Sequence, residues 1–169
     1  MALFSANLDS LRELYTDQLQ HLYSMETQLT EALPKMADAA TDPQLKQAFN
    51  NHLQETREHE TQLKGILGKT EQSVDPRKSK AMATLITEGE DIIKDVEDAA
   101  VRDAGLILAA QRVEHYEMAS YGTVRNFARI LGDDQAAQIL DEILQEEGHA
   151  DHLLTEISNS ANTRAKRAA

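Results

Sequence analysis

The 169-residue sequence contains no cysteine and no tryptophan, and it has only three prolines and seven glycines. The absence of cysteine excludes disulfides, thiolate catalysis, iron–sulfur clusters and cysteine-ligated zinc. Any metal ion would have to be held by carboxylate and imidazole groups, which suit iron, manganese or zinc. Because proline and glycine are scarce and the long stretches between them are rich in Ala, Leu, Glu, Gln and Lys, the composition predicts an all-α protein.

Basic residues are also in the minority: 17 Lys and Arg stand against 29 Asp and Glu, which gives a formal net charge of −12. This charge argues against general binding to nucleic acid or to an anionic membrane surface. No apolar run approaches the length of a membrane-spanning helix, and the first residues lack the basic start and apolar run of a signal peptide. We therefore expect no nucleic-acid or membrane partner and a cytoplasmic location.

An internal repeat relates the two halves of the chain. A shift of 91 positions takes Glu26 onto Glu117 (117 − 26 = 91), and it takes Leu53-Gln54-Glu55 onto Leu144-Gln145-Glu146. A repeat of this length governs the whole fold, and each half is expected to form one helical hairpin. The halves share acidic residues inside apolar helical patterns, where a carboxylate is costly unless something neutralises it.

Apolar residues at three- and four-residue spacing predict four long helices and one shorter helix. The expected ranges are 7–40, 43–67, 103–131 and 135–157 for the long helices and about 78–100 for the shorter one. Two short turns and one long crossover, between the second and third long helices, define the ferritin-like connectivity among four-helix bundles. We therefore predict an all-α, ferritin-like four-helix bundle over residues 1–160. The polar end of the chain, from Ser158, is expected to fray, with residues 161–169 forming a disordered tail.

A di-metal carboxylate bundle takes one Glu from each of two helices and a Glu-x-x-His pair from each of the other two. Glu26 and Glu117 fit the single carboxylates, because each lies within the apolar stripe of its helix. The fourth helix supplies Glu146 and His149 at the Glu-x-x-His spacing, which places both side chains on one face. The metal ligands predicted from the sequence are Glu26, Glu55, Glu58, Glu114, Glu117, Glu146 and His149.

The second helix leaves a choice of ligand open. Glu58 occupies the histidine position of a Glu-x-x-His pair that begins at Glu55, and His59 follows one residue later, closer to the centre of the apolar stripe. Glu58 and His59 therefore compete for one role. His52, one turn before Glu55, suits a hydrogen-bond partner of a ligand better than a ligand.

The roles of two more carboxylates are also left open. Glu147 projects nearer the apolar centre of its helix than Glu146 does, so the pattern does not decide which of the two binds metal. Glu114 lies one turn before Glu117 and is expected to be an additional or exchangeable ligand.

The third long helix resembles a known family signature. The run Val113-Glu114-His115-Tyr116-Glu117, followed by Ala119 and Tyr121-Gly122, is similar to that of the YciF/YciE-type ferritin-like family. Further matching residues are Leu22-Tyr23 with Glu26, His52-Leu53 with Glu55 and Thr56, Asp103-Ala104, and Glu146-Glu147. The resemblance covers about residues 5–157. It implies a ferritin-like bundle, an association with bacterial stress responses, a homodimer and no settled enzymatic activity.

The segment 146–151 is also similar to the fourth helix of bacterioferritins, whose ligands would correspond to Glu146 and His149. Bacterioferritins and rubrerythrins place a histidine where this chain has Glu58. The chain also lacks the cysteine-bearing rubredoxin module of full-length rubrerythrins, so an electron donor would have to be external.

We expect two metal ions as cofactors, with iron first and manganese or zinc as alternatives. Three functions are compatible with such a centre. The first is a di-iron or di-manganese site, bridged by carboxylates, that consumes peroxide or oxygen. The second is a ferroxidase within an iron-handling cage, which requires a large hollow oligomer. The third is a non-catalytic stress protein that acts through a partner, which the absence of bound metal would favour.

Overall fold

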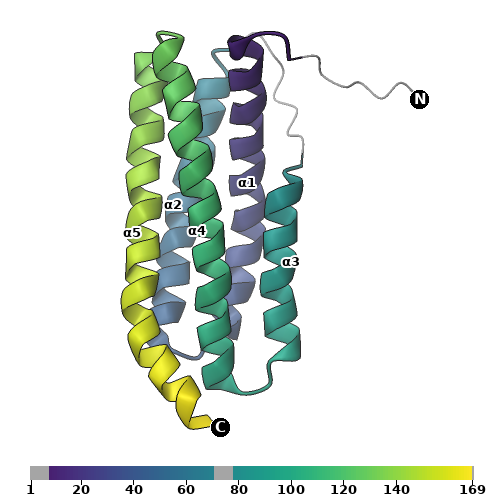
Figure 1. Cartoon of the computed structure of the whole chain (residues 1–169), viewed down its shortest axis with the longest axis vertical. Coiled ribbons are helices and arrows are strands. Elements are labelled where there is room, and N and C mark those ends of the chain that lie inside the picture. Colours follow the sequence, from purple (N-terminus) through teal and green to yellow (C-terminus); the bar gives the residue numbers. More distant parts are fainter. Residues whose placement is uncertain (1–7, 71–77, 169) are drawn as a thin grey trace, which may run out of the picture.

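The computed structural model describes residues 8–70 and 78–168. Within these residues the chain forms α1 (Leu11–Ala39), α2 (Pro43–Leu67), α3 (Lys80–Asp95), α4 (Ala99–Ile130), α5 (Asp134–Ala165) and a terminal 3-10 turn (Lys166–Ala168). Figure 1 shows the four long helices α1, α2, α4 and α5 aligned along the long axis of the molecule, with the shorter α3 beside α1. The predicted all-α bundle with a short helix in its crossover is confirmed. The expected start of the first helix, Asn7, and most of the expected loop at 69–78 lie outside the described residues.

Each helix begins at a short polar side chain that accepts hydrogen bonds from free backbone N–H groups of the first turn. These caps are Ser10, Asp42, Ser79, Asp98 and Asp133. Asp42 accepts from the N–H groups of Gln44 and Leu45 at 2.7 and 3.2 Å. Asp133 accepts from the N–H of Ala136 at 3.1 Å. Because 42 + 91 = 133, the repeat has kept the starting point of the second helix of each hairpin.

The apolar stripes of the long helices meet along the axis of the bundle. Leucines from all four helices are fully buried there, namely Leu19, Leu45, Leu63, Leu106 and Leu140. Burial of one such side chain contributes about 1.5–3 kcal/mol to folding. This packing fixes the rotation of each helix, and it turns the acidic residues within the stripes toward the interior.

The crossover helix α3 packs against α1 and α4 of the same chain. Its Met82 is fully buried. Gly105 of α4 permits the close approach of the two helices, because a Cβ atom at that position would lie 2.7 Å from Cγ2 of Ile92. A larger residue there would force the tightly packed helices to shift.

Where the sequence predicted a frayed, disordered C-terminal tail, the structure has helix: α5 continues to Ala165 and ends in the 3-10 turn. Ala161 is fully buried against the bundle. Arg164 forms an ion pair with Asp42, the residue that caps α2. These contacts hold the last turns of α5 as helix despite their polar composition. Ala169 lies outside the described residues.

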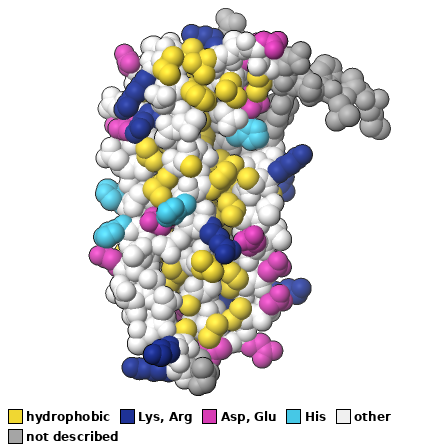
Figure 2. All heavy atoms as spheres, viewed as in Figure 1, with side chains coloured by type: hydrophobic (Ala, Val, Ile, Leu, Met, Phe, Trp, Pro, Cys, Tyr) yellow, Lys and Arg dark blue, Asp and Glu magenta, His cyan; other side chains and the backbone are white. Residues whose placement is uncertain are grey.

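Figure 2 shows hydrophobic, acidic and basic side chains interspersed on one face of the molecule. Among the described residues, no helix combines the length and the apolar character needed to cross a bilayer.

Candidate metal centre

Six buried side chains with metal-binding atoms meet inside the bundle in two overlapping groups. One group is His52, Glu114, Glu117 and Glu147, and the other is Glu26, His59 and Glu147. Within each group, one ligand atom per residue lies within 4.8 Å of all the others. The residues come from all four long helices, and every one of them is buried. The apolar core therefore brings together donors that are far apart in the sequence.

Glu147 of α5 is shared by both groups. Its Oε1 lies 3.1 Å from Nδ1 of His59, and its Oε2 lies 3.8 Å from Nε2 of His52. The second partner of His59 is Oε2 of Glu26 at 3.7 Å, and the second partner of His52 is Oε1 of Glu114 at 3.4 Å. Glu147 thus presents one oxygen to each group, as a bridging carboxylate would.

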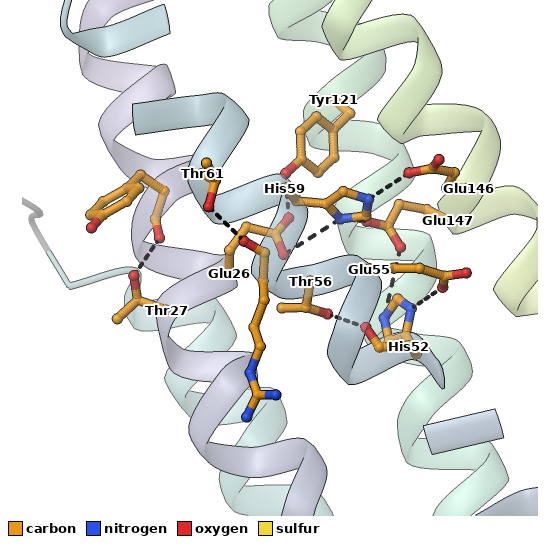
Figure 3. A network of polar contacts seen from close by, with 12 residues as sticks. Glu26, Thr27, His52, Glu55, Thr56, His59, Thr61, Tyr121, Glu146 and Glu147 are labelled. Atoms are coloured by element: carbon orange, nitrogen blue, oxygen red, sulfur yellow. Dashed lines mark hydrogen bonds and ion pairs between the residues drawn. The ribbon is translucent and has the colours of Figure 1, made fainter. Parts of the chain in front are cut away.

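The remaining nitrogen of each histidine faces a carboxylate at the edge of the cluster. Nε2 of His59 is hydrogen-bonded to Oε2 of Glu146 at 2.7 Å. Nδ1 of His52 lies 3.5 Å from Oε2 of Glu55. Figure 3 shows both pairs. Glu55 and Glu146 are related by the 91-residue shift, and their side chains are 47% and 50% exposed. A carboxylate behind a metal-binding histidine fixes its ring orientation and tautomer.

Tyr121 of α4 holds the first glutamate of the cluster. Its fully buried hydroxyl donates a hydrogen bond to Oε1 of Glu26. Burial and the negative charge of Glu26 raise the pKa of Tyr121 well above its ordinary value, so the phenol keeps its proton. The other oxygen of Glu26 stays directed at His59 (Figure 3).

Buried polar atoms in folded proteins are normally hydrogen-bonded. In this cluster, nine buried atoms make no hydrogen bond among the described residues, although several of them lie at ion-pair distances of 3.1–3.8 Å from an oppositely charged group. They are Oε2 of Glu26, both ring nitrogens of His52, Nδ1 of His59, Oε2 of Glu114, and both oxygens of Glu117 and of Glu147. All nine are carboxylate oxygens or imidazole nitrogens, the donor types that suit iron, manganese and zinc. The residues therefore fit a metal centre.

The carboxylates are costly to ionise at this place. Burial raises the pKa of Glu117 well above its ordinary value, and the charges of Glu147, Glu26 and Glu114 add to the effect. Burial also raises the pKa of Glu114 to about 8, against the opposing influence of His52. Crowded carboxylates in a medium of low polarity favour protonation unless a cation replaces the proton.

The histidines respond in the opposite sense to burial. Burial lowers the pKa of His52, but the nearby Glu114, Glu55 and Glu147 outweigh it and raise that pKa to about 10. In the same way Glu147 and Glu26 overcome burial and raise the pKa of His59 to about 11. The cluster as a whole therefore attracts positive charge, in the form of protons or of metal ions.

The structure brings only part of the predicted ligand set together. Glu26, Glu114 and Glu117 lie in the cluster. Glu55 and Glu146 lie at its edge against the two histidines. The predicted ligands Glu58 and His149 are exposed. The competitor of Glu58 on α2, His59, is buried in the cluster. Of the two choices that the sequence left open, His59 rather than Glu58 and Glu147 rather than Glu146 therefore occupy the interior positions.

The interior donors differ from the expected Glu-x-x-His positions by one residue of helical register. The Glu-x-x-His positions of the repeat are 56 and 59 in α2 and 147 and 150 in α5 (56 + 91 = 147; 59 + 91 = 150). A step of one residue turns a side chain by about 100° around the helix, from the buried face to its edge. Each half carries one member of such a pair, His59 in the first half and Glu147 in the second, while the other two positions are Thr56 and Ala150.

Two further donors compensate for the missing members. His52 lies one turn before Thr56, and Glu114 lies one turn before Glu117. The sequence identified Glu114, but it assigned His52 to a supporting role. The position of His52 on the buried side of α2, one turn from Thr56, was the available signal for a direct one.

A bundle of two helical hairpins joined by a long crossover, with carboxylates and histidines from all four long helices at its centre, is a ferritin-like carboxylate protein in architecture. Residues 10–167 match the family described as "Domain of unknown function (DUF892)". The chain belongs to this family.

Individual relatives agree with this assignment. Protein YciF of Escherichia coli strain K12 is 39% identical over 165 residues, which cover 96% of this chain and 99% of that protein. The crystal structure of the E. coli stress protein YciF matches with a TM-score of 0.89 at 38% identity, over 92% of this chain and 99% of that one. YcfI of Rhodopseudomonas palustris matches with a TM-score of 0.86 at 35% identity, over 90% of this chain and 97% of that one. The predicted YciF-type membership is confirmed.

Proposed function

We propose that the cluster binds two metal ions that share Glu147, and that this centre reacts with peroxide or dioxygen in protection against stress. The observation that carries the proposal is the place of Glu147 between two groups of buried donors, each of which includes atoms that make no hydrogen bond. One ion would be held by His52, Glu114, Glu117 and one oxygen of Glu147. The second ion would be held by Glu26, His59 and the other oxygen of Glu147.

Charge balance supports two divalent ions. The four buried glutamates carry four negative charges when ionised, and two divalent cations carry four positive charges (4 × −1 + 2 × +2 = 0). Both histidines would then be neutral, as metal ligands must be. A neutral interior avoids the large cost of isolated charges in an apolar core.

The chain's own residues would prepare the centre for redox chemistry. Glu55 and Glu146 would orient the histidines, and Tyr121 would hold Glu26 in place. A pair of redox-active ions supplies the two electrons that reduction of a peroxide consumes. We propose iron for this role, because mixed carboxylate and imidazole ligands suit it.

The stress role is supported by the relative with 38% identity, which is described as a stress protein. Relatives of the same fold can nevertheless differ in function, so the donors of this chain itself carry the chemical part of the proposal.

Metal titration tests the proposal. Metal-free protein is titrated with Fe(II) or Mn(II) in competition with a chromophoric chelator, and bound metal is counted by elemental analysis. We expect two ions per chain for the natural sequence. Glu147→Gln should lose both tight sites, because it removes the shared ligand, whereas Glu114→Gln should keep one. Unchanged stoichiometry in Glu147→Gln would contradict the shared-ligand arrangement.

Glu58→Gln is the matched control. It makes the same chemical change on an exposed residue that the Glu-x-x-His spacing had suggested as a ligand. We expect it to bind two ions with the affinity of the natural sequence. Loss of an ion in this variant would restore Glu58 to the ligand set.

A further inference from the structure

A cavity of about 140 Å³ adjoins the cluster between α2 and α5. Two members of the four-residue group, His52 and Glu114, line it. Both side chains are buried, and both ring nitrogens of His52 and one oxygen of Glu114 lack a hydrogen-bond partner. The half-exposed Glu55 and Glu146 also line the cavity. The cavity therefore extends from partly exposed carboxylates to one side of the cluster.

The repeat explains why space is left there. Ala150 lines the cavity and corresponds to His59 of the first half (59 + 91 = 150). In the first half the imidazole of His59 fills the interior beside Glu26 and Glu147. In the second half the methyl group of Ala150 leaves that volume free. The two sides of the proposed centre are thus unequal, and the side that contains His52 and Glu114 faces the cavity.

The size and lining of the cavity define the ligand that it would admit. A cavity of about 150 Å³ takes up one benzene molecule, so this one has room for roughly six non-hydrogen atoms or fewer. Its walls include Ala48, Phe49 and Leu153, and two carboxylates lie at its partly exposed part. At that part, the carboxylates of Glu55 and Glu146 outnumber the single imidazole of His149, and together with the apolar walls they disfavour anions. The cavity fits a small neutral molecule.

We infer that this cavity is the access route and binding space for a small neutral molecule, of the size of nitric oxide, dioxygen or hydrogen peroxide, on the His52 side of the metal centre, and that Ala150 keeps it open. The inference rests on the proposed function, because it identifies the side from which a ligand would reach that same metal centre. It adds a direction of approach, a ligand class and a residue that controls access.

Filling the cavity tests the route. Ala150→Leu adds three carbon atoms, which occupy roughly half of the free space. The protein is loaded with Fe(II) without oxygen, and the binding of nitric oxide is followed by stopped-flow absorbance and by electron paramagnetic resonance. We expect Ala150→Leu to bind two ions, as the natural sequence does. Its rate of nitric oxide binding should be at least about ten-fold lower. Ala119→Leu makes the same change at an exposed position of α4 and should leave the rate unchanged.

Ala48→Leu fills the cavity from α2 and should also slow the binding of nitric oxide. It provides the same test if Ala150→Leu fails to fold. Iron-loaded filling variants that bind nitric oxide at the rate of the natural sequence would overturn this inference alone. A natural sequence that takes up no iron would overturn the proposed function, and this inference with it.

A second arm tests the preference for neutral ligands. Asn51→Lys adds a positive charge at an exposed residue that lines the cavity, whereas Asn50→Lys adds it at an exposed neighbour outside the lining. We expect Asn51→Lys to accelerate the binding of azide to the Fe(III)-loaded protein and to leave the binding of nitric oxide to the Fe(II) form unchanged. Equal azide rates in Asn51→Lys and Asn50→Lys would contradict the charge selection.

Discussion

Two buried acidic residues of α4, Glu117 and Asp103, should respond in opposite ways to loss of charge. Both oxygens of Glu117 lack hydrogen-bond partners. Asp103 accepts hydrogen bonds from the N–H of Thr41 at 2.8 Å, from the hydroxyl of Thr41 at 2.6 Å and from the N–H of Asp42 at 2.9 Å. Burial is the same for both residues, at 0% and 1% exposure, so only their partners distinguish them.

The expected magnitudes follow from these partners. In metal-free protein near neutral pH, Glu117→Gln removes a carboxyl whose raised pKa makes it take up a proton on folding, and it should stabilise the fold by about 1–3 kcal/mol. Asp103→Asn removes a satisfied acceptor and should destabilise it by about 1.5–3 kcal/mol. For a domain of this length, 1 kcal/mol corresponds to roughly 2–4 °C in melting temperature. The two variants should therefore melt on opposite sides of the natural sequence.

Bound metal should reverse the ranking for Glu117 alone. At a free metal concentration of about 100 times Kd, one site contributes about 2.7 kcal/mol, or roughly 5–11 °C. Glu117→Gln should lose much of this gain, and Asp103→Asn should keep all of it. The assay is calorimetry or circular dichroism in EDTA and in Mn(II), at one pH. If Glu117→Gln destabilises the metal-free protein as Asp103→Asn does, Glu117 is a structural residue and the reasoning is refuted.

Three further predictions concern pH, the edge carboxylates and the assembly. The raised pKa of Glu114, and likewise that of His52, makes the metal-free fold lose stability as pH rises from about 4.5 towards 10, because the unfolded chain releases these protons first. Metal replaces the protons, so the gain in melting temperature on adding Mn(II) should be larger at pH 8 than at pH 5.5, and an equal gain would contradict proton–metal competition. Glu55→Gln and Glu146→Gln should each weaken metal affinity about 10- to 100-fold in chelator competition while two ions still bind at saturation; loss of an ion would make either residue a ligand. Light scattering should give a native mass about twice the 18.8 kDa of one chain, as the family resemblance implies, and the mass of a hollow cage would contradict this.

Most of the fold could be predicted from the sequence because its signals are local and periodic. The long helices follow from apolar residues at helical spacing, and the caps Asp42 and Asp133 mark where α2 and α5 begin. The 91-residue repeat predicted that two helical hairpins are joined by one long crossover. The last turns of α5 escaped prediction because Arg164 is held by Asp42, 122 positions away in the sequence.

The site was predicted less completely, for a geometric reason. Glu26 and Glu117 could be identified because apolar residues flank each of them, and both are buried in the cluster. An apolar stripe is about 100° wide, which equals the turn of one residue, so it cannot separate Glu146 from Glu147. The match of Glu146 and His149 to a short motif favoured a register in which both residues are exposed, whereas Glu147 is buried. His52 lies on the buried side of α2, one turn from Thr56, and the packing of α2 against α4 and α5 places it beside Glu114, Glu117 and Glu147.

The most direct test of a shared-carboxylate centre is anomalous diffraction from crystals grown with Fe(II), recorded on both sides of the iron absorption edge. We predict two iron peaks inside the bundle, one beside His52, Glu114 and Glu117 and the other beside Glu26 and His59, with Glu147 between them. Iron found only at exposed carboxylates such as Glu58, or an interior without iron in fully loaded crystals, would contradict the account.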